Sequence, residues 1–201
     1  MIANKYVIGI TGQSGSGKGY VSEILKENGI PVADTDIIGH NVILKDMPAY
    51  SEIVDYFGCD ILDGDKNPDR KKLAKIVFSD AEKLKKLSEI THKHIKAETL
   101  NFIENSNSVI VGVDGAVIID SPVECMCDCL IAVLAPFDVR VKRVILRDGI
   151  DEESAKSRLL AQKDEKFYSD KCDYVINNDG TLDVEKQVED IIKAIKEKLN
   201  G

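Results

Sequence analysis

The sequence predicts an α/β fold in which a five-stranded parallel sheet carries helices on both faces. Two observations support it. Five short apolar segments alternate with longer segments whose apolar residues recur at helical spacing, an order typical of parallel sheets with crossover helices. A glycine-rich segment directly follows the first apolar segment. With 201 residues, 43% hydrophobic and 31% charged, the chain has the size and composition of one globular domain, 1–201.

The N-terminal part of the chain predicts a strand, a helix and a second strand. Residues 6–11 are apolar and β-branched, which favours a strand. Residues 20–28 have apolar side chains at helical spacing, and Gly29 followed by Pro31 ends that helix. Residues 30–36 then predict the second strand. Such a unit implies that the two strands form a parallel pair joined by a crossover helix.

The middle of the chain predicts a helical insertion. Residues 36–104 have mainly helical patterns, including one long amphipathic helix over 81–104. This block is long for a simple crossover, so we expect a small substrate-binding cap at 36–105. The remaining strands are expected at 108–113, 129–135 and 173–178, and the remaining helices at 137–148, 150–162 and 184–199.

The charge balance and hydropathy exclude several classes of protein. The net charge is −8, from 27 basic and 35 acidic residues, which argues against nucleic acid as a partner. No apolar run approaches the length that spans a membrane, and the N-terminus lacks the plan of a signal peptide. We therefore expect a cytoplasmic protein without a membrane partner.

Three of the five cysteines, Cys125, Cys127 and Cys129, are spaced by single residues. Such a cluster could bind a metal, but zinc sites usually combine two Cys-x-x-Cys pairs or add histidines. The alternative is that these thiols pack as small apolar side chains at the start of a buried strand. The spacing favours the second interpretation.

The glycine-rich segment fits the phosphate-binding pattern G-x-x-x-x-G-K-[ST] at all positions but the last. Its backbone N–H groups and the lysine are expected to bind nucleotide phosphates, aided by the following helix N-terminus. A glycine loop that binds an anion without catalysis is the alternative. The residues assigned to the nucleotide here are Gly12, Gln13, Ser14, Gly15, Ser16, Gly17, Lys18, Gly19 and Tyr20.

Gly19 stands where a serine or threonine hydroxyl normally binds Mg²⁺. The site could be inactive for that reason. Alternatively, Mg²⁺ is held by the nucleotide, by water and by a carboxylate, since Mg²⁺ commonly takes only one or two protein carboxylates. The loop resembles that of adenylate kinases, which carry Gly-Lys-Gly at this place. That resemblance makes Gly19 compatible with activity.

Asp34 and Asp36 lie just past the second predicted strand. The carboxyl ends of strands line the ligand crevice in open α/β folds, so both should lie beside the phosphate loop. An aspartate there can accept the proton of an acceptor hydroxyl or hold a metal. The alternative is a turn carboxylate and a helix N-cap, which is plausible above all for Asp36.

Seven segments together resemble the dephospho-coenzyme A kinase family of P-loop kinases, over nearly the whole chain. Most other P-loop kinases lack the middle segments, so the resemblance is specific. The segments are GITGQSGSGK (9–18), DTDIIGH (34–40), DRKKLAKIVF (69–78), LSEITH (87–92), RVILRDG (143–149), RLLAQ (158–162) and DYVINNDGT (173–181).

This resemblance implies a three-layer P-loop kinase fold with a helical acceptor-binding cap and a lid at 147–170. It also implies transfer of the γ-phosphoryl group of ATP to the ribose 3′-hydroxyl of dephospho-coenzyme A, with Mg²⁺, in a monomer or small homo-oligomer. The implied catalytic residues are Asp34, Lys18 and Arg143, with Asp34 also a possible Mg²⁺ ligand. Arg147 and Asn178 are assigned to the nucleotide, and Asp36, Arg70, His92 and Asp114 to the acceptor.

Five residues depart from the family pattern: Gly19, Tyr20, Lys93, Ala116 and Asp120. They replace a serine, a threonine, a proline, a second proline and a glutamate at positions near the expected metal and acceptor. Two alternatives therefore stay open. One is a related kinase for another small acceptor, such as a nucleotide or nucleoside. The other is a nucleotide-binding protein with impaired catalysis.

Overall fold

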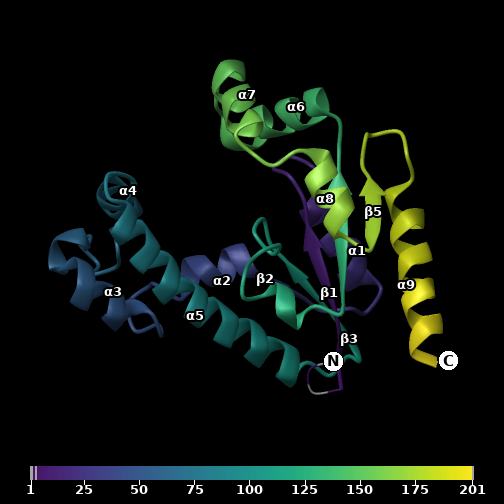
Figure 1. The fold of residues 1–201 in the computed structure, drawn as a ribbon, viewed down its shortest axis with the longest axis horizontal. Coiled ribbons are helices and arrows are strands. Elements are labelled where there is room, and N and C mark those ends of the chain that lie inside the picture. Colours follow the sequence, from purple (N-terminus) through teal and green to yellow (C-terminus); the bar gives the residue numbers. More distant parts are fainter. Residues whose placement is uncertain (1, 3, 201) are drawn as a thin grey trace.

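Five parallel strands form one sheet in the order β2-β3-β1-β4-β5 (Figure 1). The computed structural model describes residue 2 and residues 4–200. The predicted five-stranded parallel sheet with helices on both faces is confirmed. The strands are β1 (Tyr6–Thr11), β2 (Val32–Asp34), β3 (Ile110–Asp114), β4 (Cys129–Leu134) and β5 (Tyr174–Asn177).

Helices form from the expected periodic segments, and aspartates begin several of them. Asp151, for example, accepts the backbone N–H of Ser154, which satisfies one of the free donors at that helix start. The helices are α1 (Lys18–Glu27), α2 (Thr35–Asn41), α3 (Tyr50–Phe57), α4 (Arg70–Phe78), α5 (Ala81–Asn105), α6 (Phe137–Asp148), α7 (Glu152–Leu160), α8 (Glu165–Lys171) and α9 (Val184–Asn200), with short 3-10 turns at Cys59–Ile61 and Glu124–Met126.

Alternation along the strands divides the core into two layers. Ile8 and Ile10 of β1 point to one face, where α1 and α9 pack, while Val7 points to the other. That second face is covered by α5, through the fully buried Ile103, and by α8. Successive side chains of a strand point to opposite faces, so one buried strand contributes to both layers. Figure 1 shows α9 and α5 on opposite sides of the sheet.

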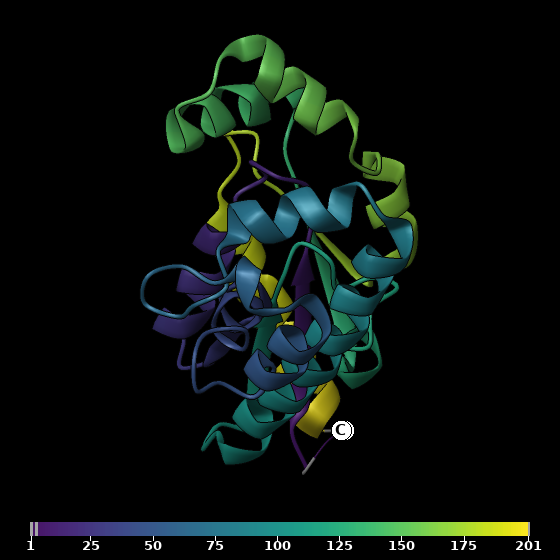
Figure 2. The same cartoon turned by 90° about the vertical axis from the view of Figure 1, so that its left-hand side faces the viewer.

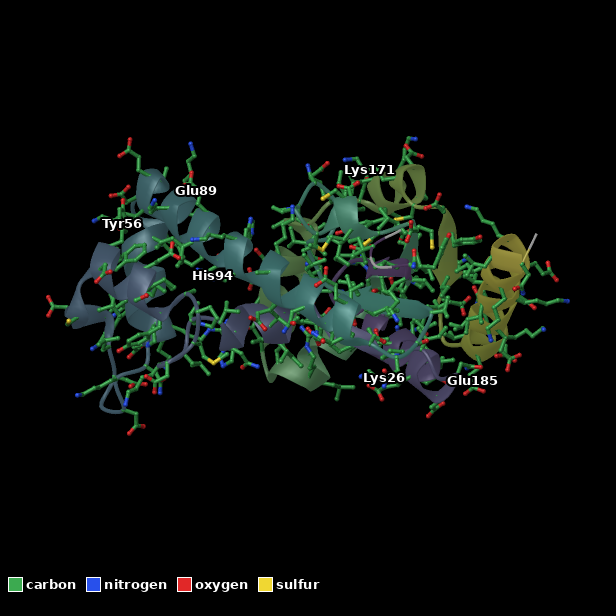
Figure 3. The ribbon with its side chains drawn as sticks, turned by 90° about the horizontal axis from the view of Figure 1, so that it is seen from below. Lys26, Tyr56, Glu89, His94, Lys171 and Glu185 are labelled. Carbon is green, nitrogen blue, oxygen red and sulfur yellow. The ribbon has the colours of Figure 1, made fainter. Side chains whose placement is uncertain are left out.

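Helices α2 to α5 extend beyond the β2 edge of the sheet and have an apolar cluster of their own (Figures 1 and 2). In Figure 3, the labelled Tyr56 of α3 and His94 of α5 lie at this end of the molecule, far from Lys26 and Glu185. The buried residues of this cluster are Val42, Ile43, Ala49, Ile53, Ile61, Leu73, Val77 and Ile90.

The α6–α7 hairpin lies above the carboxyl ends of the strands (Figure 2). Val141 and Val144 of α6 pack against Ala155 and Leu159 of α7. This small cluster is separate from the clusters of the two main layers. The hairpin makes polar contacts with the phosphate loop, described below. Among the described residues, none of the helices has both the length and the hydropathy that crossing a bilayer requires.

Two expectations about the fold were wrong. The first two strands do not pair directly, because β3 lies between β1 and β2. Helix α8, Glu165–Lys171, was not expected as a helix. It has only 7 residues, so it is too short to show helical periodicity in the sequence. The helix is recognised only in the structure, where it packs against β4.

The cysteine cluster lies at the amino end of β4. Cys129 is buried in the core, Cys127 is half-buried and Cys125 is exposed. Burial raises the pKa of Cys127 to about 12 and that of Cys129 to about 11, so both thiols stay protonated at neutral pH. Within the described residues no three His, Cys, Asp or Glu side chains are placed to hold a metal. The packing favours the interpretation of these thiols as small apolar side chains.

Candidate active site

One cavity of about 420 Å³ lies at the carboxyl ends of β1, β2 and β3. In the parallel register Asp34 lies opposite Asp114, and Asp114 lies opposite Ile10, one residue before the end of β1. Pairing therefore brings two carboxylates beside the phosphate loop. The cavity brings together most of the predicted site residues: Gly15, Gly17, Lys18, Gly19, Tyr20, Asp34, Asp36, Asp114, Arg143 and Arg147.

The phosphate loop packs too closely against its neighbours for side chains at two of its glycines. Gly12 has φ +148° and Gly17 has φ +99°, both in the region that favours glycine. A Cβ atom at Gly12 would overlap the carbonyl oxygen of Val133, and one at Gly17 would overlap the side-chain amide of Asn178. The glycine pattern thus follows from contact with β4 and with the end of β5.

Arg143 and Asn178 form hydrogen bonds with carbonyl oxygens of the loop backbone. Asn178 donates a hydrogen bond from Nδ2 to the carbonyl oxygen of Ser16 over 2.9 Å. Arg143 donates from Nη1 to the carbonyl oxygens of Gly15 and Ser16, both 3.2 Å away, and from Nη2 to Oδ1 of Asn178 over 3.0 Å. These two residues fix the backbone whose N–H groups would bind phosphate. A direct contact of Arg143 with a nucleotide stays a prediction.

The first half of the loop is also held in place. Gln13 and Ser16 are almost fully buried and border the loop's interior rather than the cavity. Gln13 donates to the carbonyl oxygen of Lys163 over 2.7 Å, and the N–H of Ser14 donates to Oε1 of Gln162 over 3.0 Å. A contact of Gln13 or Ser16 with a nucleotide stays a prediction.

Lys18 folds back over the loop and donates from Nζ to the carbonyl oxygen of Gly12 over 3.0 Å. Burial lowers the pKa of Lys18, and the nearby Asp114, Asp36 and Asp34 act in the opposite direction. Removing an ammonium group from water is energetically costly unless anionic groups lie close to it. Phosphate oxygens in this cavity would be such groups.

Asp114 is the most buried carboxylate of the cavity, with 7% of its surface exposed. Burial raises its pKa, while a hydrogen bond from the hydroxyl of Ser22, 2.7 Å long, and the charge of Lys18 lower it. Ser22 lies on the inner face of α1 and was not predicted as a site residue. A small polar residue beside Val21 and Ile24 was the only signal in the sequence.

Asp34, rather than Asp36, caps α2. Its Oδ1 accepts the backbone N–H groups of Asp36 and Ile37, both over 2.9 Å. Capping occupies only this one carboxylate oxygen, since no hydrogen bond to Oδ2 occurs among the described residues. Asp34 therefore combines the capping role with a place in the cavity wall.

A smaller cavity of about 160 Å³ lies between the start of α2, the middle of α5 and the segment after β3. Asp36 borders both cavities, and His92 of α5 borders the smaller one together with Val117 and Val123. The predicted residues Asp36 and His92 are thus brought together. Arg70 borders neither cavity. It is exposed at the start of α4, and its side chain makes no hydrogen bond or ion pair with other described residues.

The two unusual residues of the loop differ in their surroundings. Gly19 is exposed, and an added Cβ would meet no atom within 4 Å. Tyr20 donates its hydroxyl to Oε1 of Glu185 over 2.9 Å, which ties α1 to the start of α9, where Figure 3 labels Glu185. Neither residue therefore supplies a hydroxyl at the usual metal position.

Asn178 borders a separate cavity of about 430 Å³ beside the loop, with Pro136 and Asp179. This cavity adjoins the phosphate loop, because Asn178 in its wall forms hydrogen bonds with both Arg143 and the loop. The arrangement suits a nucleotide whose phosphates lie on the loop and whose base lies near the end of β5.

Comparisons with known proteins agree with this geometry. A family model described as dephospho-CoA kinase matches residues 6–184. A relative named dephospho-CoA kinase from Lactobacillus johnsonii is 33% identical over 195 residues, with 94% of this chain and 98% of the relative covered. A solved protein from Thermus thermophilus superposes with a TM-score of 0.81 at 28% identity, covering 98% of this chain and 99% of that one. A dephospho-CoA kinase from Campylobacter jejuni superposes with a TM-score of 0.69 at 26% identity, covering 96% and 98%.

The Ser22 hydroxyl gives a testable prediction about Asp114. Because this hydrogen bond favours the charged carboxylate, Ser22→Ala should raise the pKa of Asp114 further above its ordinary value. An NMR titration of the side-chain carboxyl carbon measures the shift directly. Ser157→Ala, on the distant helix α7, is the control and should leave the titration unchanged. A lower or equal pKa in Ser22→Ala would contradict the assigned role of the hydrogen bond.

Proposed function

This chain belongs to the dephospho-CoA kinase family, and we propose that it transfers the γ-phosphoryl group of ATP to the ribose 3′-hydroxyl of dephospho-CoA. The observation that carries the proposal is the shared cavity. It places Lys18 and the phosphate loop, which suit the donor, against Asp34 and Asp114 at the ends of two adjacent strands. Phosphoryl transfer needs this positioning of charge more than covalent chemistry.

Asp34 is the proposed base for the acceptor hydroxyl. Its Oδ1 is fixed by two backbone N–H groups, so the carboxylate has a set orientation. Oδ2 then accepts the proton as the hydroxyl attacks phosphorus. Asp36 and His92, which border the adjoining smaller cavity, are proposed to hold the acceptor. Asp114 and Arg70 are proposed contacts of the same substrate, and for Arg70 a movement of α4 would be required.

Arg143, Arg147 and Asn178 are proposed to serve the nucleotide. Arg143 and Asn178 keep the phosphate loop in shape, and Arg147 borders the cavity with an exposed cationic group. We propose that the lid comprises 147–170 and that the acceptor-binding insertion comprises 36–105. Closure of a lid over the donor would exclude water and limit hydrolysis of ATP.

The residues present fit a Mg²⁺ ion bound together with ATP. The cavity holds carboxylate oxygens from Asp34 and Asp114, the ligand type that Mg²⁺ prefers. No group of three candidate ligands is placed to hold an ion within the described part of the chain, so most of the coordination would come from phosphates and water. When bound, Mg²⁺ neutralises charge on the phosphates. We propose Asp34 as a protein ligand of this ion.

We also propose a cytoplasmic protein that acts as a monomer or small homo-oligomer. Both proposed substrates are charged small molecules of intracellular metabolism, and the net charge of −8 gives no support for nucleic acid as a partner.

An acceptor panel tests the function. A coupled ADP-release assay with dephospho-CoA, nucleosides and nucleoside monophosphates should give turnover with dephospho-CoA alone. Ala116 and Asp120, which depart from the family pattern, lie in the loop beside the smaller cavity. Because these departures could change which acceptor binds, the panel includes acceptors other than dephospho-CoA. Turnover only with another acceptor would replace the proposed substrate. ATP binding without turnover on any acceptor would support a binding protein instead.

Asp34→Asn tests the base. Asparagine caps helices as well as aspartate does, so α2 should stay intact. The rate of transfer should fall by about a hundredfold or more, the range in which general bases act, while the affinity for ATP measured without Mg²⁺ stays nearly unchanged. Asp80→Asn is the matched control, because Asp80 caps α5 through the same pair of backbone N–H contacts outside the cavity. Transfer at the normal rate in Asp34→Asn would remove Asp34 from the mechanism.

Gly19→Ser tests how Mg²⁺ is held. The position has no left-handed φ and no atom within 4 Å of an added Cβ, so serine fits without strain. The added hydroxyl should lower the Mg²⁺ concentration for half-maximal ATP binding, measured by calorimetric titration. Gly19→Ala adds the Cβ without the hydroxyl and should behave like the parent chain. An unchanged metal requirement in Gly19→Ser would show that this hydroxyl has no part in metal binding here.

A further inference from the structure

The segments RVILRDG and RLLAQ meet in an ionic network outside the roles assigned so far. Arg158 of α7 donates from Nη1 to Oδ2 of Asp148, at the end of α6, over 2.7 Å. Asp148 also accepts two hydrogen bonds from its neighbour Arg147, from Nε to Oδ1 over 2.7 Å and from Nη2 to Oδ2 over 3.0 Å. One carboxylate thus joins a guanidinium of each hairpin helix.

This network reaches the phosphate loop at Ser14. Nη2 of Arg147 donates to the hydroxyl of Ser14 over 3.2 Å. Just beyond the end of α7, Gln162 accepts the backbone N–H of the same Ser14 over 3.0 Å. Helix α6 and the segment that follows α7 therefore both contact Ser14, which is 133 and 148 positions away from Arg147 and Gln162 in sequence.

The hydrogen bonds of Arg147 leave part of its guanidinium unused. A guanidinium has five N–H donors, and the two Nη1 donors have no partner among the described residues. Arg147 borders the cavity that holds Lys18. Planar, paired bonding to Asp148 fixes the plane of the guanidinium, and a fixed guanidinium suits bidentate contact with phosphate oxygens.

The degree of burial separates this network from an ordinary surface ion pair. The Asp148 side chain is 22% exposed, against 55% for Arg147 and 54% for Arg158. The carboxylate is the covered centre between two more exposed cations. Its hydrogen bonds with Arg147 hold the pKa of Asp148 below its usual range, so it stays charged at neutral pH.

We propose that Asp148 is a positioning residue that holds the Arg147 guanidinium in the wall of the donor cavity. Arg158 in turn holds Asp148, and the contact with Ser14 ties the α6–α7 hairpin to the phosphate loop. The inference rests on the proposed function in one respect, that ATP is the ligand of this cavity. Without the carboxylate, the long Arg147 side chain would have to lose its rotamer freedom when ATP binds.

The direction in which ATP affinity changes in Asp148→Ala distinguishes a positioning role of Asp148 from a purely electrostatic one. Asp148→Ala removes a negative charge beside the phosphate site, so charge alone predicts tighter ATP binding. Positioning predicts weaker binding, by about fivefold to tenfold in the dissociation constant, where tenfold corresponds to ~1.4 kcal/mol. Calorimetric titration with ATP, in the absence of acceptor, measures the constant. Asp148→Glu returns a carboxylate and should recover part of the affinity.

Two variants of α7 provide a matched comparison. Arg158→Met removes the second partner of Asp148 and should weaken ATP binding severalfold. Lys156→Met removes the same charge from the same helix but breaks only the exposed pair with Glu152, 2.6 Å long. Lys156→Met should bind ATP like the parent chain. Thermal unfolding confirms that each variant is folded, and the KM for dephospho-CoA should stay within about twofold throughout.

Several outcomes would overturn the proposal. ATP binding that is unchanged or tighter in folded Asp148→Ala contradicts it, and so does equal weakening by Arg158→Met and Lys156→Met. The proposed function fails separately, if the parent chain binds ATP but does not phosphorylate dephospho-CoA. In that case the ATP dissociation constants of the same variants still decide whether Asp148 positions Arg147.

Discussion

The close contact between the phosphate-loop backbone and its neighbours is the constraint on which the site depends. Glycine is required at Gly12 and Gly17 because β4 and Asn178 leave no room for a side chain. The same closeness lets Arg143 and Asn178 bond to the loop's carbonyl oxygens. A loop fixed in this way needs little reorganisation when it binds an anion, which favours both affinity and catalysis.

Helix α6 connects this loop to the rest of the donor site. Arg143 and Arg147 are four residues apart, so they lie on one face of the helix, and both reach the loop. They bond to it in different ways. Arg143 holds backbone carbonyl oxygens, whereas Arg147 contacts a side chain and keeps donors unused. One helix face thus carries both the arginine that holds the loop backbone and the arginine proposed to bind the ligand of the loop.

The carboxylates of the cavity have different environments although they lie side by side. Asp114 is buried, and burial raises its pKa, whereas Asp34 is bonded to the N-terminus of α2. A carboxylate held by two backbone N–H groups has a fixed orientation, which suits the proposed acceptance of a proton. A buried carboxylate beside Lys18 is better suited to balancing charge. Parallel pairing thus brings together two carboxylates whose local surroundings differ.

The elements that depend on a local pattern could be predicted from the sequence. Apolar alternation and helical spacing are local properties, and they predicted the strands and the long helix over 81–104. The glycine pattern, also local, predicted the phosphate loop. The motif also identified Lys18, and the position of Asp34 after a strand identified it as a cavity residue. The short helix α8 has too few residues to show periodicity, so it was missed.

Only the tertiary structure decided which distant residues meet. The place of β3 between β1 and β2 brings Asp114 opposite Asp34, 80 residues away in the chain. The bonds of Ser22 to Asp114 and of Ser14 to Gln162 join residues 92 and 148 positions apart. No periodicity in one sequence encodes such pairs, because they arise from the packing of whole elements. The motifs therefore predicted the candidate site residues, whereas the long-range contacts that hold these residues in place follow from the fold.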